Sequence, residues 1–235
     1  MKDRLISDAI GLVQESIHSA KCHRKAGLFL KLDLKKAYDW VNWNFVRLVL
    51  VQIGLDWKVV QWIMGCVSST SFAVLINGSP SEFFKAERGL RQGCPLSPLL
   101  FLLVVDCLSR LIEQAREASK FGGFKVSLGN LVSHLLFFDD IFVLGSGSIE
   151  EWILLKGTVE IFCQASDLEI NLKKSILIHS NVDELTLMAV LSRWGVSSSS
   201  LEDGFKYLGY FLKATNYRIS DWYWLIKKIE NKIHC

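Results

Sequence analysis

Two adjacent aspartates lie between two strongly apolar segments, and this setting makes them candidates for chemistry. Residues 134–144 read HLLFFDDIFVL, so Asp139 and Asp140 are flanked by the Phe, Leu, Ile and Val side chains that favour strands. Neighbouring carboxylates at the tight turn of a hairpin repel each other and are costly to desolvate. A divalent cation is the usual remedy, and a cation held by carboxylates points to phosphate chemistry.

A third carboxylate, Asp33, ends another apolar strand, which the sequence predicts over residues 28–32. Two adjacent antiparallel strands would bring Asp33 close to the aspartate pair. Three carboxylates around one pocket can hold two Mg²⁺ ions about 4 Å apart, an arrangement that supports in-line phosphoryl transfer. Without the aspartate pair, a helix cap or a strand-end turn would be the favoured interpretation of Asp33.

Three further features have residue types that suit a nucleotide site. Tyr38 follows Asp33 by five positions and could fold over the pocket, although spacing alone favours an ordinary core aromatic. Gly93 in the run Arg91-Gln92-Gly93 permits close backbone approach and Gln92 can donate and accept, although a plain loop is equally compatible with this composition. Lys174 could supply a charge or a proton to a leaving pyrophosphate, although a surface lysine is the simpler interpretation.

The elements that must position these residues alternate between helices and short strands. Apolar spacing predicts helices over residues 5–19, 57–66, 99–117, 150–165, 182–194 and 221–233, and one more whose N-cap is Asp39 or Asn42. Strands are predicted over residues 28–32, 124–126, 175–179 and 207–212, in both arms around the aspartate pair, and in a hairpin over residues 72–85. Residues 197–200 are predicted to be a polar linker. This mixture predicts an α+β fold with helices on one face of an antiparallel sheet.

Length and composition limit the classes of protein to which this chain can belong. With 235 residues, 50% of them hydrophobic, the chain can bury one sizeable core. A net charge of +3 does not by itself require a nucleic-acid partner, and the basic clusters are more simply solvated helix faces. The six cysteines form no CxxC pair and are expected to be reduced, mostly buried thiols of an intracellular protein, in the nucleus or the cytoplasm. No apolar segment is long enough to predict a membrane span.

Five segments in order resemble successive motifs of reverse transcriptases, most closely those of plant-type non-LTR (LINE-like) retrotransposons. They are LDLKKAYDWV at 32–41, NGSPSEFFKAERGLRQGCPLSPLLF at 77–101, SHLLFFDD at 133–140, LEINLKKS at 168–175 and FKYLG at 205–209. The resemblance implies a right-hand polymerase palm with partial fingers and a possible start of the thumb. It assigns residues 28–41 and 89–204 to the palm, 1–27 and 42–88 to partial fingers, connecting helices and a hairpin, and 205–235 to the palm–thumb junction.

The resemblance also implies an activity, RNA-directed DNA synthesis by nucleotidyl transfer from dNTPs to a primer 3′-hydroxyl. The implied cofactor is a pair of Mg²⁺ ions, for which Mn²⁺ can substitute. The implied partners are an RNA template, a DNA primer and dNTPs, within a larger polyprotein that carries an endonuclease. By motif position, the metal-binding acids are Asp33, Asp139 and Asp140. Leu34 belongs with the substrate-binding residues, and its carbonyl is a candidate further ligand. The ring that rejects ribonucleotides is Tyr38, the substrate loop is Arg91, Gln92 and Gly93, and the lysine near the pyrophosphate is Lys174. The resemblance thus reverses the simpler interpretations of Tyr38 and Lys174.

Two residues depart from the pattern of that family. Phe138 stands before the acid pair where a small alanine is usual, and its ring is expected to crowd the primer terminus. Trp40 stands where a basic residue is usual.

The chain also begins after the expected first strands of the fingers, which leaves an alternative function: a catalytically inactive palm remnant that retains the fold, with or without nucleic-acid binding. A two-metal nuclease would explain the acids but not Tyr38 or the glutamine loop.

Overall fold

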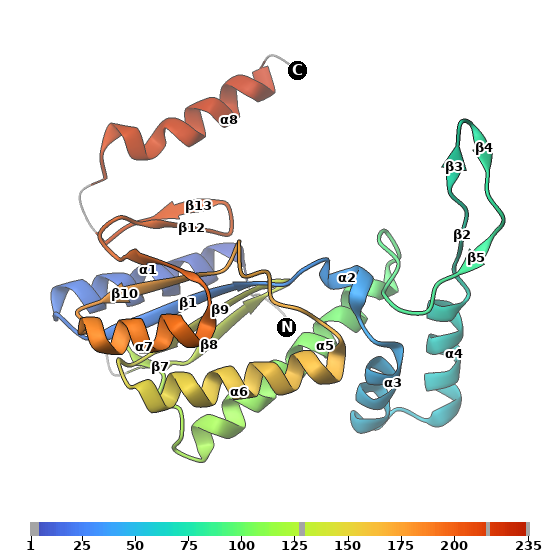
Figure 1. Cartoon of the computed structure of the whole chain (residues 1–235), viewed down its shortest axis with the longest axis horizontal. Coiled ribbons are helices and arrows are strands. Elements are labelled where there is room, and N and C mark those ends of the chain that lie inside the picture. The colour runs from blue at the N-terminus through green and yellow to red at the C-terminus, as the bar shows by residue number, and fades with distance from the viewer. Residues whose placement is uncertain (1–4, 127–129, 215–216, 234–235) are drawn as a thin grey trace.

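The fold is built around a five-stranded sheet with the order β11–β10–β1–β9–β8 (Figure 1). The computed structural model describes residues 5–126, 130–214 and 217–233. Neighbouring strands are antiparallel except for the parallel pair β10–β11. The strands are β1 (Gly27–Asp33), β8 (His134–Phe137), β9 (Asp140–Gly145), β10 (Ile176–Ser180) and β11 (Ser197–Ser200).

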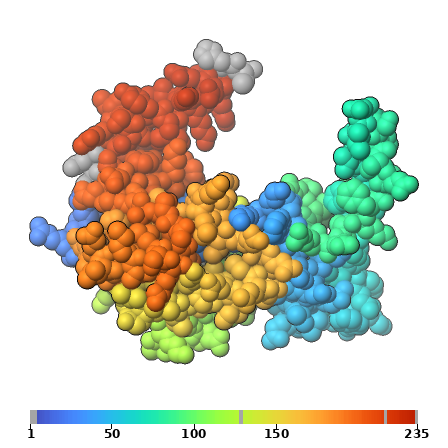
Figure 2. Space-filling model, viewed as in Figure 1, coloured from blue at the N-terminus to red at the C-terminus, as the bar shows by residue number. Residues whose placement is uncertain are grey.

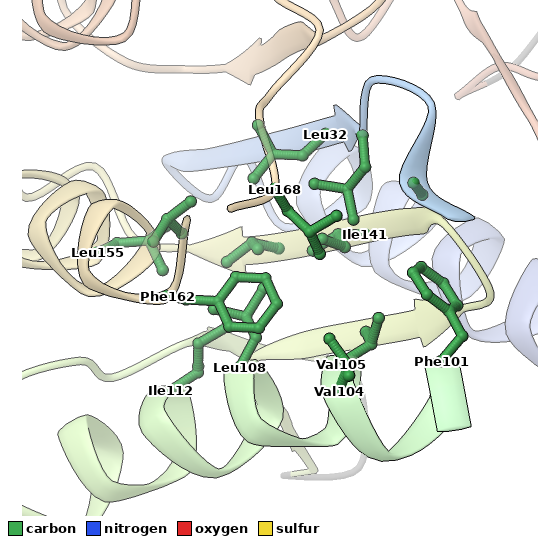
Figure 3. Packing of buried hydrophobic residues seen from close by; sticks show 14 of the residues in the cluster. Leu32, Phe101, Val104, Val105, Leu108, Ile112, Ile141, Leu155, Phe162 and Leu168 are labelled. Atoms are coloured by element: carbon green, nitrogen blue, oxygen red, sulfur yellow. The ribbon is translucent and has the colours of Figure 1, made fainter. Parts of the chain in front are cut away.

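Three helices cover one face of the sheet, namely α5 (Leu96–Glu117), α6 (Ile149–Ser166) and α7 (Glu184–Trp194). Alternate residues of β1 point to this face, so Leu28, Leu30 and Leu32 enter the same buried cluster as Phe101 and Phe162. Figure 3 shows the apolar side of α5 packed beneath β8 and β9, with Phe162 of α6 between the helix and β9. Burying each of these large side chains contributes about 1.5–3 kcal/mol. The core therefore fixes the sheet and α5 relative to each other.

The opposite face of the sheet is covered by α1 (Ile6–Cys22) and by the hairpin of β12 (Phe205–Tyr207) and β13 (Tyr210–Leu212). Phe29 and Phe142 point to this face and join a second buried cluster with Ile17 and Tyr207. The rings of Phe142 and Tyr207 lie 4.9 Å apart, centroid to centroid. The expectation of helices on only one face was therefore wrong, because β1 and β9 alternate apolar side chains to both faces and both need cover.

A second group of elements, within residues 37–85, lies beside the sheet. The short strands of this group, within residues 71–85, project as a narrow ribbon (Figures 1 and 2). Asn77 and Gly78 at the ribbon tip both have positive φ, 51° and 84°, which confirms the predicted Asn-Gly hairpin turn. At the other side of the body, α8 (Tyr223–Ile233) follows the short 3₁₀ helix η2 (Ile219–Trp222). The group beside the sheet, which does not include α8, comprises α2 (Ala37–Trp40), α3 (Trp43–Gln52), α4 (Trp57–Ser68), β2 (Ser71–Phe72), β3 (Leu75–Ile76), β4 (Ser79–Pro80) and β5 (Phe84–Lys85).

Three predicted elements were wrong in detail. The polar linker 197–200 is strand β11, because an edge strand needs only backbone partners, and β10 supplies them. The single strand predicted over 207–212 is the end of the hairpin β12–β13, which turns at Leu208 and Gly209, both with positive φ. Helix α5 begins at Leu96 rather than residue 99, because Pro98 lies in its first turn, where no backbone N–H is needed.

Smaller features complete the described structure. Strands β6 (Phe124–Lys125) and β7 (Leu131–Val132) form a two-stranded pair. The five described cysteines are free thiols, and Cys235 lies outside the described residues. Two of the five are exposed and three are half-buried, so the expectation that most would be buried was wrong. None of the helices in the described ranges is both long enough and apolar enough to cross a bilayer.

Candidate active site

The strand register brings the predicted acids to one end of the sheet. Asp33, the last residue of β1, is the direct cross-strand partner of Asp140, the first residue of β9. Asp140 also pairs with Phe137 of β8, so Phe138 and Asp139 form the two-residue turn between these strands. Asp33 and Asp140 belong to the alternate set of residues that faces α1 and hairpin β12–β13. We call the segment Phe138–Asp139 the acid turn.

The acid turn contains an unusual backbone conformation. Phe138 has a φ of +52°, in the left-handed region, and its side chain is 45% exposed. Positive φ at the first position of a two-residue hairpin turn favours glycine, and a bulky residue there costs about 1–2 kcal/mol. The Phe138 ring lies edge-on to Phe137, with 5.4 Å between ring centroids, and it lines a cavity of about 370 Å³ with His134 and Leu136. The turn thus keeps a large ring directly beside the acids.

Two lysines neutralise two of the acids. Lys31 Nζ lies 3.3 Å from Asp140 Oδ1, and Lys174 Nζ lies 3.9 Å from Asp33 Oδ2. Burial raises the pKa of Asp140, the nearby Lys31 ammonium lowers it, and the charges of Asp139 and Asp33 raise it further. The three carboxylates therefore form one electrostatic unit at the end of the sheet. Lys174, predicted from the sequence, lies beside Asp33 and remains largely exposed.

The segment around residues 169–175 fixes the backbone of Asp33. The Asp33 N–H donates to Ser175 Oγ at 3.1 Å, and the Asp33 carbonyl accepts from the Asn171 N–H at 2.8 Å. Leu34 forms an isolated bridge with Ile170. The two backbone hydrogen bonds of this bridge use the carbonyl of Asp33 and the N–H of Lys35, so neither uses the Leu34 carbonyl. The bridge therefore leaves the Leu34 carbonyl without a role in it.

The donor set at this end of the sheet suits a hard divalent cation. Carboxylate and carbonyl oxygens are the ligands that Mg²⁺ accepts in proteins. Among the described residues, however, no three acidic, histidine or cysteine side chains lie close enough together to hold an ion as they stand. In this structure Asp140 pairs with Lys31, and Asp33 lies within ion-pair distance of Lys174. The structure therefore shows the acids in a lysine-paired arrangement.

Tyr38 lies between the acids and the loop that precedes α5. Its ring stacks on Phe101 of α5, with 4.8 Å between centroids and 22° between planes. Burial raises the pKa of Tyr38, and the charge of Asp139 raises it further, which places the ring within the field of the acid turn. Tyr38 also lines a cavity of about 550 Å³ together with Gln92, Gly93 and Cys94. The structure thus brings Tyr38 and the Gln92–Gly93 pair to one cavity.

Hydrogen bonds join the loop 89–95 to the turn that follows β1. Gln92 Nε2 donates to Asp39 Oδ1 at 3.2 Å, and the Leu90 N–H donates to the Tyr38 carbonyl at 2.6 Å. Asp39 thus contacts Gln92, whereas the N-cap of α3 is Asn42, whose side chain accepts from two backbone N–H groups. Arg91 is exposed beside Gln92, on the rim of a second cavity of about 530 Å³.

Trp40, the second departure from the family pattern, contacts a basic residue of another segment. The Arg88 guanidinium lies over the Trp40 ring, 4.7 Å from its centroid. Such a cation–π contact is worth about 0.5–1 kcal/mol at an exposed site. The contact therefore holds a positive charge next to α2.

Sequence reasoning missed three residues that build this site. Lys31 and Ser175 contact the acids directly, and Gly89 holds the loop 89–95 against α2. The location of Lys31 could have been predicted from the sequence, since it precedes Asp33 by two positions and so shares its face of the strand. Gly89 was not predictable, because its tight contact is made by a distant part of the chain.

Substituting Gly89 by alanine is expected to destabilise the fold by about 2–4 kcal/mol. Gly89 has a φ of +86°, and an added Cβ would lie 2.6 Å from the Asp39 carbonyl oxygen. The substitution should also displace Gln92 from Asp39 and so weaken nucleotide use. Chemical denaturation measures the change in the free energy of unfolding.

Gly54 provides a matched control for this substitution. It has a φ of +87° but no atom within 4 Å of an added Cβ, so Gly54→Ala should cost only the backbone strain, about 1 kcal/mol. Equal losses for Gly54→Ala and Gly89→Ala would show that the contact between Gly89 and Asp39 does not support the loop.

Comparisons with known proteins show the family to which the chain belongs. The sequence model of the family described as "Reverse transcriptase (RNA-dependent DNA polymerase)" matches residues 2–212. The chain is similar to a "Retrovirus-related Pol polyprotein from type-1 retrotransposable element R2" of Popillia japonica, with 27% identity over 90% of the chain and 31% of that protein. It is also similar to the "Transposon TX1 uncharacterized 149 kDa protein" of Xenopus laevis, with 27% identity over 92% of the chain and 16% of that protein. The chain thus spans less than a third of the length of these relatives.

Solved structures show the same fold at low sequence identity. One is described as the structure of telomerase from Candida tropicalis in complex with a TWJ fragment of telomeric RNA. It matches with a TM-score of 0.60 and 13% identity over 89% of this chain and 32% of that chain. The described sheet and helices therefore have the right-hand polymerase fold.

Proposed function

We propose that this chain, which belongs to the reverse transcriptase (RNA-dependent DNA polymerase) family, catalyses RNA-directed DNA synthesis. The chain is a reverse transcriptase domain of retrotransposon origin. One observation carries the proposal of activity: Asp33 and Asp140 are direct partners at strand ends, and Tyr38 links the acid turn to the cavity lined by Gln92. Acids and a cavity of nucleotide size thus lie at the same end of the sheet.

The acids would hold two Mg²⁺ ions, or Mn²⁺ in their place, with Asp33, Asp139, Asp140 and the Leu34 carbonyl as ligands. The chemistry that such ions supply is activation of a primer 3′-hydroxyl and neutralisation of charge on a leaving pyrophosphate. Lys174, an exposed ammonium beside Asp33, would place a further charge or proton near that pyrophosphate. Lys174 would thus be a catalytic residue in addition to the acids.

The nucleotide would occupy the cavity beside Tyr38. The Tyr38 ring is held from behind by Phe101, so it can exclude a ribose 2′-hydroxyl by contact without moving aside. Gln92 can donate and accept hydrogen bonds, and Gly93 carries no side chain that would obstruct a base. Arg91, exposed at the adjacent cavity, would contact phosphate.

The larger surroundings suit an RNA template and a DNA primer. In Figure 2 the ribbon and α8 project on opposite sides of the body, and the surface between them is hollowed. We propose residues 28–41 and 89–204 as palm, 1–27 and 42–88 as partial fingers, connecting helices and hairpin, and 205–235 as palm–thumb junction. In this division α1 is a connecting helix that packs on the palm sheet. The partners would include dNTPs and, within a larger polyprotein, an endonuclease.

Replacing Phe138 by alanine is expected to raise any incorporation rate by about 3- to 10-fold. The reason is that the ring is 45% exposed at the acid turn, where it would meet the primer terminus. Alanine keeps a Cβ at the strained φ, so the free energy of unfolding should change by less than about 1 kcal/mol. Steady-state single-nucleotide incorporation measures the effect. An equal or lower rate for Phe138→Ala would refute the idea that this ring crowds the primer.

Primer extension on an RNA template tests the proposed function. The folded chain, with Mg²⁺ or Mn²⁺, should add the dNTP that is complementary to the first unpaired template base. Absence of any addition by the folded protein would favour the inactive palm remnant. Loss of the template without primer growth would instead favour a two-metal nuclease.

A further inference from the structure

Lys31 joins three elements at the edge of the proposed site. It lies on β1, two residues before Asp33 and on the same face of the sheet. Its ammonium lies 3.3 Å from Asp140 Oδ1 on β9 and donates to the Lys206 carbonyl on β12 at 3.5 Å. The side chains of Lys31 and Asp140 are only 19% and 24% exposed, so water screens this pair less than a surface pair.

This contact gives Asp140 a lysine partner on its own face of the sheet. Asp140 is directed toward Lys31 and hairpin β12–β13, whereas Asp139 is exposed on the acid turn. Lys174 cannot replace Lys31 in this role, since it is 71% exposed and its contact with Asp33 is longer, at 3.9 Å. The less exposed lysine therefore governs the position of Asp140.

We propose that Lys31 is a positioning residue that anchors Asp140 against hairpin β12–β13 and opposes the binding of divalent ions by the acids. The proposal rests on the proposed function, because it assumes that the acids bind such ions. The ammonium supplies a positive charge to Asp140 in the absence of a metal ion. A divalent ion would therefore bind the other carboxylate oxygen, Oδ2, against the repulsion of an ammonium that stays on Oδ1.

Removing the ammonium should accordingly tighten metal binding. A positive charge several ångströms from a divalent cation repels it by an amount that corresponds to roughly 3- to 10-fold in affinity at high effective dielectric. Lys31→Met keeps the length and the apolar stem of the side chain but has no charge. We expect Lys31→Met to bind Mn²⁺ roughly 3- to 10-fold more tightly than the wild type, and Lys31→Arg to stay within about twofold.

Nucleotide addition should change in the opposite direction. Without its anchor, Asp140 can adopt other rotamers, so we expect the rate of incorporation at saturating Mn²⁺ to fall about tenfold in Lys31→Met. A purely structural lysine would weaken or leave unchanged both metal binding and turnover. Tighter metal binding together with slower turnover therefore distinguishes a positioning role.

Titration of the full chain with Mn²⁺, followed by the electron paramagnetic resonance signal of the free ion, tests the proposal without primer or nucleotide. Lys213→Met is a matched control, because Lys213 forms an ion pair with Asp221 and the two side chains are only 15% and 13% exposed. Lys213→Met should leave the Mn²⁺ affinity unchanged. If Lys31→Met does not fold, Lys31→Gln provides the same loss of charge with a side chain that can still donate to Asp140.

Tighter Mn²⁺ binding by the uncharged Lys31 variant alone would support the proposal. Unchanged or weaker binding by that variant would overturn it, as would equal tightening by Lys213→Met. Failure of every variant to bind Mn²⁺ would also overturn it. Primer extension judges the proposed function separately, so a wild-type chain that extends primers while Lys31→Met binds Mn²⁺ no more tightly refutes only this inference.

Discussion

Asparagine in place of Asp33 is expected to lower RNA-directed incorporation by about 10³-fold while the protein stays folded. The side chain would lose its charge at the point where Asp33 faces Asp140 across the strands. The hydrogen bonds that fix this position use the Asp33 backbone, which the substitution leaves in place. Its side-chain pair with the exposed Lys174 contributes little to stability.

Asp203 provides the matched control, since it is exposed and lies in the turn before β12. Asp203→Asn should keep the wild-type rate within about twofold. The two variants should have the same circular dichroism spectrum. Their free energies of unfolding should agree to within about 1 kcal/mol. An Asp33→Asn protein that is folded and retains most of its activity would show that Asp33 is not a ligand in the reaction.

Alanine in place of Tyr38 is expected to increase ribonucleotide use relative to deoxynucleotide use by roughly 10- to 200-fold, the range that one steric group in a pocket can supply. The ring is stacked on Phe101, so a 2′-hydroxyl that meets it cannot push it aside. Removing the ring opens the cavity shared with Gln92. The ratio of kcat/KM values for rNTP and dNTP on the same primer and template measures the change.

Tyr38→Phe separates the effect of the ring from the effect of the hydroxyl. It keeps the stacked ring and removes only the hydroxyl, so discrimination should stay within about twofold of the wild type. If Tyr38→Phe loses discrimination as fully as Tyr38→Ala, the hydroxyl rather than the ring selects the sugar. If neither variant changes the ratio, the cavity beside Tyr38 does not bind the nucleotide sugar.

The strands that carry the acids could be predicted from the sequence, because each is short, apolar and encoded by its own local segment. Period-two alternation in β1 and β9 puts Asp33 and Asp140 on one face, and a tight hairpin leaves Asp139 at the turn. The predicted hairpin with Asn77 and Gly78 was confirmed for the same reason, since its turn chemistry is local.

Features that depend on contacts between distant segments were not predictable. The four serines of β11 form a strand only because β10 offers an unpaired edge. The turn at Leu208 interrupts what reads as one strand, since tertiary packing of Phe205 and Tyr207 decides where the chain reverses. The pairing of Lys31 with Asp140 needs the β1–β9 register, which no single segment encodes.

The most direct test of the proposed activity is the addition of a single nucleotide to a DNA primer annealed to RNA templates that differ in one base. The four dNTPs are offered separately, with Mg²⁺, to the full chain. We predict that the complementary dNTP is added in each case and that Asp139→Asn, while still folded, adds none. Addition that does not follow the template base, or equal addition by Asp139→Asn, would contradict a template-directed polymerase site built on these acids.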